Sequence, residues 1–199
     1  VALLEACGGG GGSGPATPGS ATPLTPPVSD QVSFATDYAA ARFLQHAQFS
    51  SSEAEIAAVK SMGASAWLDS QMSLPSSLGG WDWLAKQGYN AIDSNQFYQM
   101  DYQANFMAWN QIMAAPDGVR RRMALALSEF FVASISGVST ISWSQFAMGH
   151  YWDILCNNAF GNYRQLLEEV TLSIAMGEFL NTLGNQKEDA ATGRLPDEN

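Results

Sequence analysis

Hydrophobic residues return every three or four positions along most of this chain from Ser33 onward, which is the spacing of helices that bury one face. Ser52 and Glu55 form a capping-box pattern at the start of one such segment, and Pro75 closes the next. No alternation of apolar and polar residues lasts long enough to predict a sheet. The pattern predicts a first helix that begins at Thr36 or Asp37 and a pair of short helices between 52 and 75. It predicts further helices at about 95–115, 119–134, 143–157, 162–172 and 173–183. The sequence therefore predicts an all-α fold, an irregular multi-helix bundle.

The segment 95–115 carries aromatic and large apolar residues, including Phe106 and Trp109, on more than one side of its predicted helix. A helix that is apolar all round is expected to be buried, so this segment is predicted to lie centrally. The alternative is a helical cap on a larger fold, with these aromatic faces exposed. Asp117, in the break that follows, is expected to cap the next helix.

The first seven residues are an apolar run that ends in a small residue and Cys7. Residues 8–32 are rich in Gly, Ser, Pro and Thr, a composition typical of a flexible tether. This start resembles the lipobox of bacterial lipoproteins, in which the cysteine thiol carries a diacylglycerol group. The resemblance implies that residues 1–7 are the remnant of a signal peptide, and that Cys7 anchors the protein in the bacterial cell envelope, facing the periplasm or the outer surface. The alternative is a flexible tail with a chance cysteine.

Residues 33–199 are expected to form the helical domain. The chain ends on Pro196-Asp197-Glu198-Asn199, a sequence typical of the first turn of a helix. We therefore expect this domain to be truncated at its C-terminal end, as the N-terminal part of a larger helical domain.

Nineteen acidic residues against nine basic ones give a formal net charge of −10. Nucleic acids and anionic membrane surfaces attract clustered Lys and Arg, so this balance excludes both as the main partner. Arg120, Arg121 and Arg122 are consecutive, and we expect a solvated or ion-paired helix face there. Cys156 lies in an apolar helical pattern and is expected to be a buried, inert thiol.

Candidate metal ligands gather in the last third of the chain. His150 and Asp153 are three residues apart and share one face of a predicted helix, while Glu168 and Glu169 follow on the next helix. Helix bundles build metal sites from inward-facing Glu, Asp and His side chains, so these four residues are candidates. The usual Glu-x-x-His pattern of such bundles is missing. The alternative therefore stays open that His150 binds no metal and is either hydrogen-bonded within the protein or exposed at its surface.

Glu129 is a charged residue with apolar neighbours along the chain on both sides. If its helix is buried, the carboxylate needs a partner, and Arg42, Arg121 or Arg164 could supply one. One interpretation is a structural ion pair, and the other is a catalytic carboxylate with a raised pKa. The sequence contains no Gly-x-Ser-x-Gly elbow, phosphate loop or dinucleotide fingerprint.

Four blocks of sequence carry a family resemblance: Ala41-Arg42-Phe43-Leu44, the stretch from Arg121 to Val132, Asn158-Ala159-Phe160-Gly161-Asn162-Tyr163-Arg164 with Ala175-Met176-Gly177, and Thr192-Gly193-Arg194 before Pro196. They resemble a large bacterial family known only as domain of unknown function eighteen-hundred, over about residues 38–199. The resemblance implies an exported, mostly helical protein. It also implies a partner, because genes of this family often stand beside those of a second exported family related to sulfatases and alkaline phosphatases. No established reaction or cofactor comes with it.

Two functions from different classes are consistent with these features. The first is a lipid-anchored interaction or assembly module of the cell envelope, which accounts for the anchor, the tether and the lack of catalytic signatures. The second is an extracytoplasmic enzyme, metal-dependent if the candidate ligands are used, with a carboxylate-lined site around Glu129, Asp197, Glu198 and residues beyond 199. The two can be told apart by geometry: convergence of Glu129, Glu168 or Glu169, and Asp197 with His150 in one polar pocket would favour the enzyme. Their scatter would favour the interaction module.

Overall fold

The structure is a computed structural model, and it describes residues 33–196; Cys7, the tract 8–32, Asp197 and Glu198 lie outside the described residues. The described part is all α, as the sequence predicts. Its α-helices are α1 (Asp37–Ala47), α2 (Glu53–Met62), α3 (Ala64–Met72), α4 (Gly80–Lys86), α5 (Gln103–Ala114), α6 (Gly118–Phe130), α7 (Ser144–Asn157), α8 (Tyr163–Thr171) and α9 (Ile174–Phe179). Short 3-10 helices are η1 (Phe97–Gln99), η2 (Ile135–Val138) and η3 (Thr182–Gly184).

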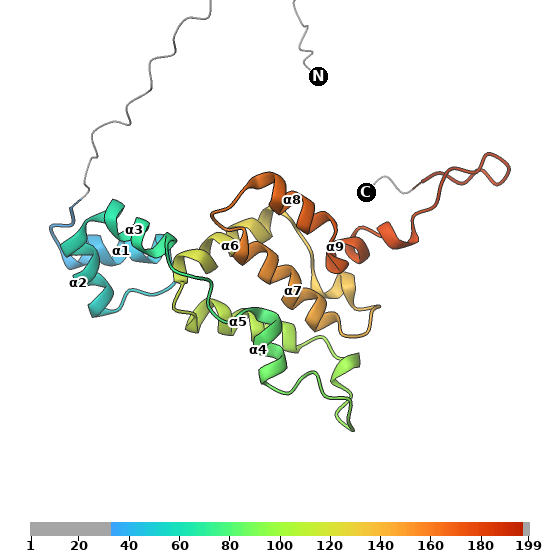
Figure 1. The fold of residues 1–199 in the computed structure, drawn as a ribbon, viewed down its shortest axis with the longest axis horizontal. Coiled ribbons are helices and arrows are strands. Elements are labelled where there is room, and N and C mark those ends of the chain that lie inside the picture. The colour runs from blue at the N-terminus through green and yellow to red at the C-terminus, as the bar shows by residue number, and fades with distance from the viewer. Residues whose placement is uncertain (1–32, 197–199) are drawn as a thin grey trace, which may run out of the picture. The chain divides into compact units, whose positions relative to one another are not determined.

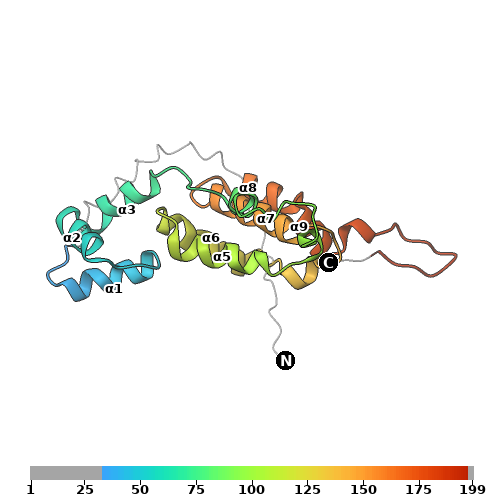
Figure 2. The same cartoon turned by 90° about the horizontal axis from the view of Figure 1, so that it is seen from below.

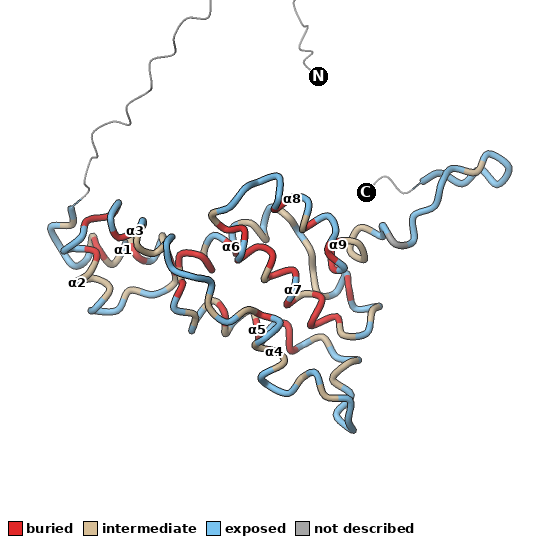
Figure 3. Tube along the Cα trace, in the orientation of Figure 1, coloured by how far each residue is buried: buried red, intermediate tan, exposed pale blue. Residues whose placement is uncertain are grey.

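The larger core is built around α7, which packs against α4, α5, α6, α8 and α9 (Figure 1). Ten of the fourteen residues of α7 are buried, and Figure 3 shows this burial running along the helix. Figure 2 shows α5 and α6 lying together on one side of α7. A helix that is apolar on nearly every side needs neighbours all round it, and α7 has them.

A second, smaller core joins α1, α2 and α3 to α6. Its buried residues are Ala40, Leu44, Val59, Trp67 and Val119. Thr36 caps α1 by accepting a hydrogen bond from the N–H of Ala39, and the predicted capping box of Ser52 and Glu55 is present at α2. These start signals are therefore confirmed.

The predicted helix over 95–115 is wrong in its first part. Only the short η1 forms there, Met100 is extended, and α5 begins at Gln103. The η1 segment is tied instead to the start of α7, because the N–H of Trp143 donates to the carbonyl of Tyr98 at 2.9 Å. The side chain of Gln145 donates to the next carbonyl back, that of Phe97, at 2.8 Å. These tertiary hydrogen bonds override the local helical tendency.

The central burial predicted for this helix is wrong as well. Phe106 is 53% exposed and Trp109 64% exposed, because α5 turns its smaller and more polar side to the core. The buried residues of α5 are Gln103, Ala104, Met107 and Gln111. The central position belongs to α7.

The helix predicted over 119–134 ends early, at Phe130. The hydroxyl of Tyr151 donates a hydrogen bond to the carbonyl of Phe131, just past this end, and Ser134 then caps η2. Asp117 stands at the position before α6, but its side chain makes no capping bond. The capping prediction for Asp117 is wrong because its carboxylate is bound elsewhere.

Candidate functional site

Three of the four candidate metal ligands lie around one surface pocket of about 460 Å³ between α7 and α8. His150 comes from α7 and is exposed, while Glu168 and Glu169 come from α8. Glu169 is already engaged, since it accepts hydrogen bonds from Asn158 at 2.7 Å and Gln165 at 2.8 Å. Among residues 33–196, no group of three or more His, Cys, Asp or Glu residues is placed to hold a metal ion. Metal binding by these side chains stays a prediction.

Asp153, the fourth candidate, anchors α4 to α7. Its carboxylate accepts hydrogen bonds from the N–H groups of Gly80 at 2.5 Å and Trp81 at 3.0 Å. Burial raises the pKa of Asp153, and these hydrogen bonds and the charge of Arg121 offset that rise only in part. Asp153 therefore fixes the start of α4 on the central helix.

A buried polar network lies where α6 begins. Arg121 has no exposed surface and Asp117 is 2% exposed. The guanidinium of Arg121 donates from Nε to Asp117 Oδ1 at 3.2 Å and from Nη2 to the hydroxyl of Ser77 at 2.7 Å. Ser77 in turn donates its hydroxyl and its N–H to the carboxylate of Asp117 at 2.5 Å and 3.1 Å. Burial by itself would raise the pKa of Asp117, but the Ser77 hydrogen bonds and the Arg121 charge outweigh it and lower that pKa.

Arg120 and Cys156 extend this network. Arg120 donates to the carbonyls of Cys156 at 3.1 Å and Leu74 at 2.8 Å, and Arg121 Nη1 lies 2.8 Å from the sulfur of Cys156. Burial raises the pKa of the Cys156 thiol to about 12. The predicted buried thiol is therefore confirmed. The ion-paired face is confirmed for Arg120 and Arg121, which pair with Asp117, but the solvated face is wrong for both because they are buried.

A small aromatic pocket of about 280 Å³ lies beside the start of α7, lined by Trp81, Asn90, Trp143 and Phe146. Phe146 is buried, whereas Trp81 is 48% exposed. Trp143 has φ 65° and ψ 29°, a left-handed conformation that is rare for a bulky residue. Sequence reasoning missed this pocket, because residues far apart in the chain form it.

An exposed apolar face runs along α5, formed by Tyr102, Phe106, Trp109 and Met113. Their spacing of four, three and four residues places them on one side of a helix. Tyr102 and Phe106 are in edge-to-face contact with ring centroids 5.4 Å apart. We call these four residues the α5 face.

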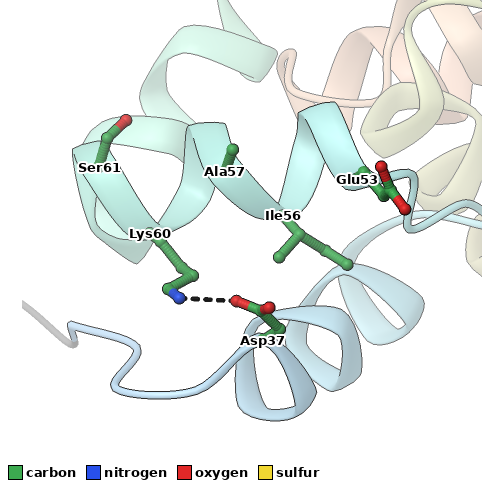
Figure 4. Close-up of a pocket in the computed structure, with 6 residues that line it drawn as sticks. All are labelled: Asp37, Glu53, Ile56, Ala57, Lys60 and Ser61. Atoms are coloured by element: carbon green, nitrogen blue, oxygen red, sulfur yellow. Dashed lines mark hydrogen bonds and ion pairs between the residues drawn. The ribbon is translucent and has the colours of Figure 1, made fainter.

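A larger surface pocket of about 620 Å³ lies between α1 and α2 (Figure 4). Lys60 reaches across from α2 to Asp37 of α1, with 2.6 Å between its Nζ and Oδ1 of Asp37. The two charges satisfy each other at the surface, and this pair joins the two helices.

The model of the family described as "Protein of unknown function (DUF1800)" matches residues 42–199. The chain belongs to the DUF1800 family. This confirms the resemblance carried by the sequence blocks, and the family description assigns no activity. No curated protein and no solved structure matches the chain. Within the described part of this DUF1800 chain, no helix is long and apolar enough to cross a membrane.

Glu129 of this DUF1800 chain is not the buried carboxylate that its apolar neighbours predict. It is exposed near the end of α6 and makes no hydrogen bond or ion pair with any described residue. Arg121, one of its expected partners, is bound to Asp117 instead. Asp117 and Arg121 are four residues apart, and this spacing was the signal in the sequence that could have predicted their pairing. Glu129 also does not line the pocket that contains His150. A catalytic role for Glu129 stays a prediction, as it does for Asp197 and Glu198, which lie outside the described residues.

Proposed function

We propose that this protein is an exported, lipid-anchored interaction module of the bacterial cell envelope, which binds a protein partner through the α5 face. Cys7 would carry the lipid, and residues 8–32 would be the tether between the membrane and the helical body. The lipobox-like start of the sequence supports the anchor, and membership of the DUF1800 family is consistent with export.

The observation that carries the proposal is the exposure of the α5 face. Phe106, Trp109 and Met113 are 53%, 64% and 77% exposed, and Tyr102 is 42% exposed. Since an aromatic side chain buries about 150–250 Å² when covered, the face offers roughly 400–500 Å² of apolar surface. An apolar patch of this size is comparable to the largest patch on a typical monomer, about 300–600 Å², and such a patch is often functional. A standard interface needs about 800 Å² on each side, so this face would form its centre.

The occupant to which we assign this face is a second protein with an apolar surface of its own. The segment Gln103–Ala114 contains no charged residue, so the partner needs no opposite charge there. A net charge of −10 makes two copies of this chain repel each other, and it also repels an anionic membrane. The exported, sulfatase-related protein that the family resemblance implies is the first candidate.

The binding experiment mixes the purified full chain with an exported sulfatase-related protein of the kind that the family resemblance implies, and follows complex formation by gel filtration with light scattering and by calorimetry. We expect a complex that Trp109→Asp weakens at least tenfold, because a charge cannot be buried at the centre of an apolar contact. Ile92→Asp is the matched control, since Ile92 is 83% exposed and lies outside α5. Equal binding by the Trp109 variant, or no complex, would refute this assignment. Self-association or vesicle binding that Trp109→Asp abolishes would assign the face to a second copy or to a membrane.

The anchor has its own test. Cells that express the protein from its own gene are labelled with a fatty-acid analogue and fractionated, with Cys7→Ser as the variant. We expect label and membrane association for the wild type and the loss of both in the variant. An unlabelled wild-type protein, or a labelled Cys7→Ser protein, would overturn the lipoprotein proposal and leave the α5 proposal untouched.

A further inference from the structure

The aromatic pocket at the start of α7 is independent of the α5 face and of the anchor. Trp81 lies in the first turn of α4, Trp143 directly precedes α7, and Phe146 lies in the first turn of α7. Asn90 adds an exposed amide from the loop after α4. The four residues thus bring three aromatic rings and one neutral polar group to a single small cavity.

The rings meet at steep angles. Trp81 and Phe146 have centroids 4.9 Å apart with their planes at 72°, and Trp143 and Phe146 have centroids 5.7 Å apart at 78°. Each Trp ring thus stands steeply to the Phe146 ring, as a wall to a floor, and we call these three residues the box; a sugar-binding surface would present a flat stacking platform instead. The geometry therefore favours a compact, rounded ligand group over an extended flat ring.

Both walls are held in place without a ligand. The left-handed backbone of Trp143 is secured on both sides, since its N–H donates to Tyr98 at 2.9 Å and its carbonyl accepts from the N–H of Phe146 at 2.8 Å. The backbone of Trp81 is bound by Asp153. A residue stays in such a sparsely populated conformation only where its surroundings enforce it. The backbone of the box is thus preorganised, which reduces the entropy lost when a ligand binds.

The aromatic and uncharged side chains that line the pocket indicate which class of ligand it binds. Aromatic rings attract cations through the negative potential of their faces, and Trp does so most strongly. The four lining residues carry no charge, and Asn90 alone among them offers a side-chain acceptor for hydrogen bonds. A primary ammonium group would lose its hydrogen bonds to water here, whereas a quaternary ammonium group has none to lose. The net charge of −10 further raises the local concentration of cations.

We infer that the box of Trp81, Trp143 and Phe146 binds a quaternary ammonium head group, of the trimethylammonium kind found in choline. The cavity of about 280 Å³ is smaller than the roughly 300–1,000 Å³ of sites for drug-sized molecules, so it suits the head group and leaves the rest of the ligand outside. Two sources share this chemistry, a free small molecule and the head group of a phosphatidylcholine lipid.

The test titrates the purified full chain with choline, followed by tryptophan fluorescence and calorimetry. Two comparison ligands isolate the chemistry: 3,3-dimethylbutanol has the same shape without the charge, and ethanolamine has a charge without the methyl groups. We expect choline to bind at least tenfold more tightly than either. Vesicles of phosphatidylcholine form a second arm, in which binding that free choline displaces identifies the lipid as a source.

Variants tie the binding to the box. Trp81→Leu is expected to abolish choline binding and Trp81→Phe to weaken it less, because Phe keeps an aromatic face. Trp83→Leu is the matched control, since Trp83 lies on the same helix but faces Tyr89, with ring centroids 6.3 Å apart. Circular dichroism verifies the fold of each variant. The inference is overturned by undetectable choline binding, by equal binding of 3,3-dimethylbutanol, or by a folded Trp81→Leu protein that binds like the wild type.

Discussion

Replacing Asp117 by Asn removes the carboxylate charge from the buried network at the start of α6 while nearly preserving its shape. Arg121, which has no exposed surface, is then left without its anion, and the new amide group faces a donor from Ser77 where an oxygen was. Breaking a buried pair in this way costs about 3–5 kcal/mol, because the remaining charge is neither hydrated nor paired. In a domain of this size, that loss lowers the melting temperature by roughly 10 °C.

The assay is urea and thermal unfolding followed by circular dichroism, with Lys60→Met as the matched control. Lys60 also forms an ion pair, with Asp37, but the two side chains are 34% and 75% exposed. An exposed pair contributes about 1 kcal/mol at most, so the control should change the melting temperature by a few degrees or less. If Asp117→Asn were as mild as Lys60→Met, the argument from burial would be refuted.

The same pair makes the stability depend on pH. The pKa of Asp117 in the folded protein is lowered from its ordinary value of 3.8, so folding favours the charged form. Its contribution to the free energy of unfolding is therefore fully present above a pH of about 4 and is lost as the pH falls through the lower, folded-state pKa. We expect the stability difference between wild type and Asp117→Asn to shrink below pH 4, and a difference that stayed constant down to pH 2 would contradict this.

Two further predictions concern packing and reactivity. A methyl group on Gly149 would meet the backbone of α4 at 3.2 Å, so Gly149→Ala should lower the free energy of unfolding by about 1–3 kcal/mol. Gly177→Ala, in open space on α9, should raise it by about 0.5–1 kcal/mol, and the reverse order in thermal melts would contradict the close approach of α4 and α7. In a Cys7→Ser background, Cys156 should not react with a disulfide reagent at pH 8 until urea is added, because its pKa of about 12 and its burial keep it protonated and covered. Rapid reaction of the folded protein would show that the thiol is accessible.

Local signals located most of the helices and their starts. The capping box at Ser52 and the cap at Thr36 depend on residues three positions apart, so the sequence alone indicates them. Asn162 caps α8 in the same local way. The family blocks also follow from the sequence, because they are runs of specific residues.

The complete polar network could not be found in this way, although the four-residue spacing of Asp117 and Arg121 is a local signal for that one pair. Ser77 is 40 residues from Asp117 and 44 from Arg121, so nothing in the local pattern indicates that the three side chains meet. For Arg120 and Arg121 the sequence left a solvated face and an ion-paired face both open, since burying a charge costs free energy unless an anion pairs with it, and the structure shows the paired arrangement. For Glu129, the apolar neighbours along the chain predicted burial, yet its side chain lies on the exposed side of α6.

The sequence by itself determined the all-α class, most of the helix starts and the family, because these depend on residues within one or two helical turns of each other. Only the tertiary structure decided which helix is central and which apolar side is left uncovered. The segment of α5 and the segment of α7 are both rich in aromatic residues, but α7 is the one against which α4, α5, α6, α8 and α9 pack, and at Gly149 the backbone of α4 approaches it closely. The aromatic box likewise exists only once α4 lies against α7, since packing between distant segments, and not local propensity, places its rings.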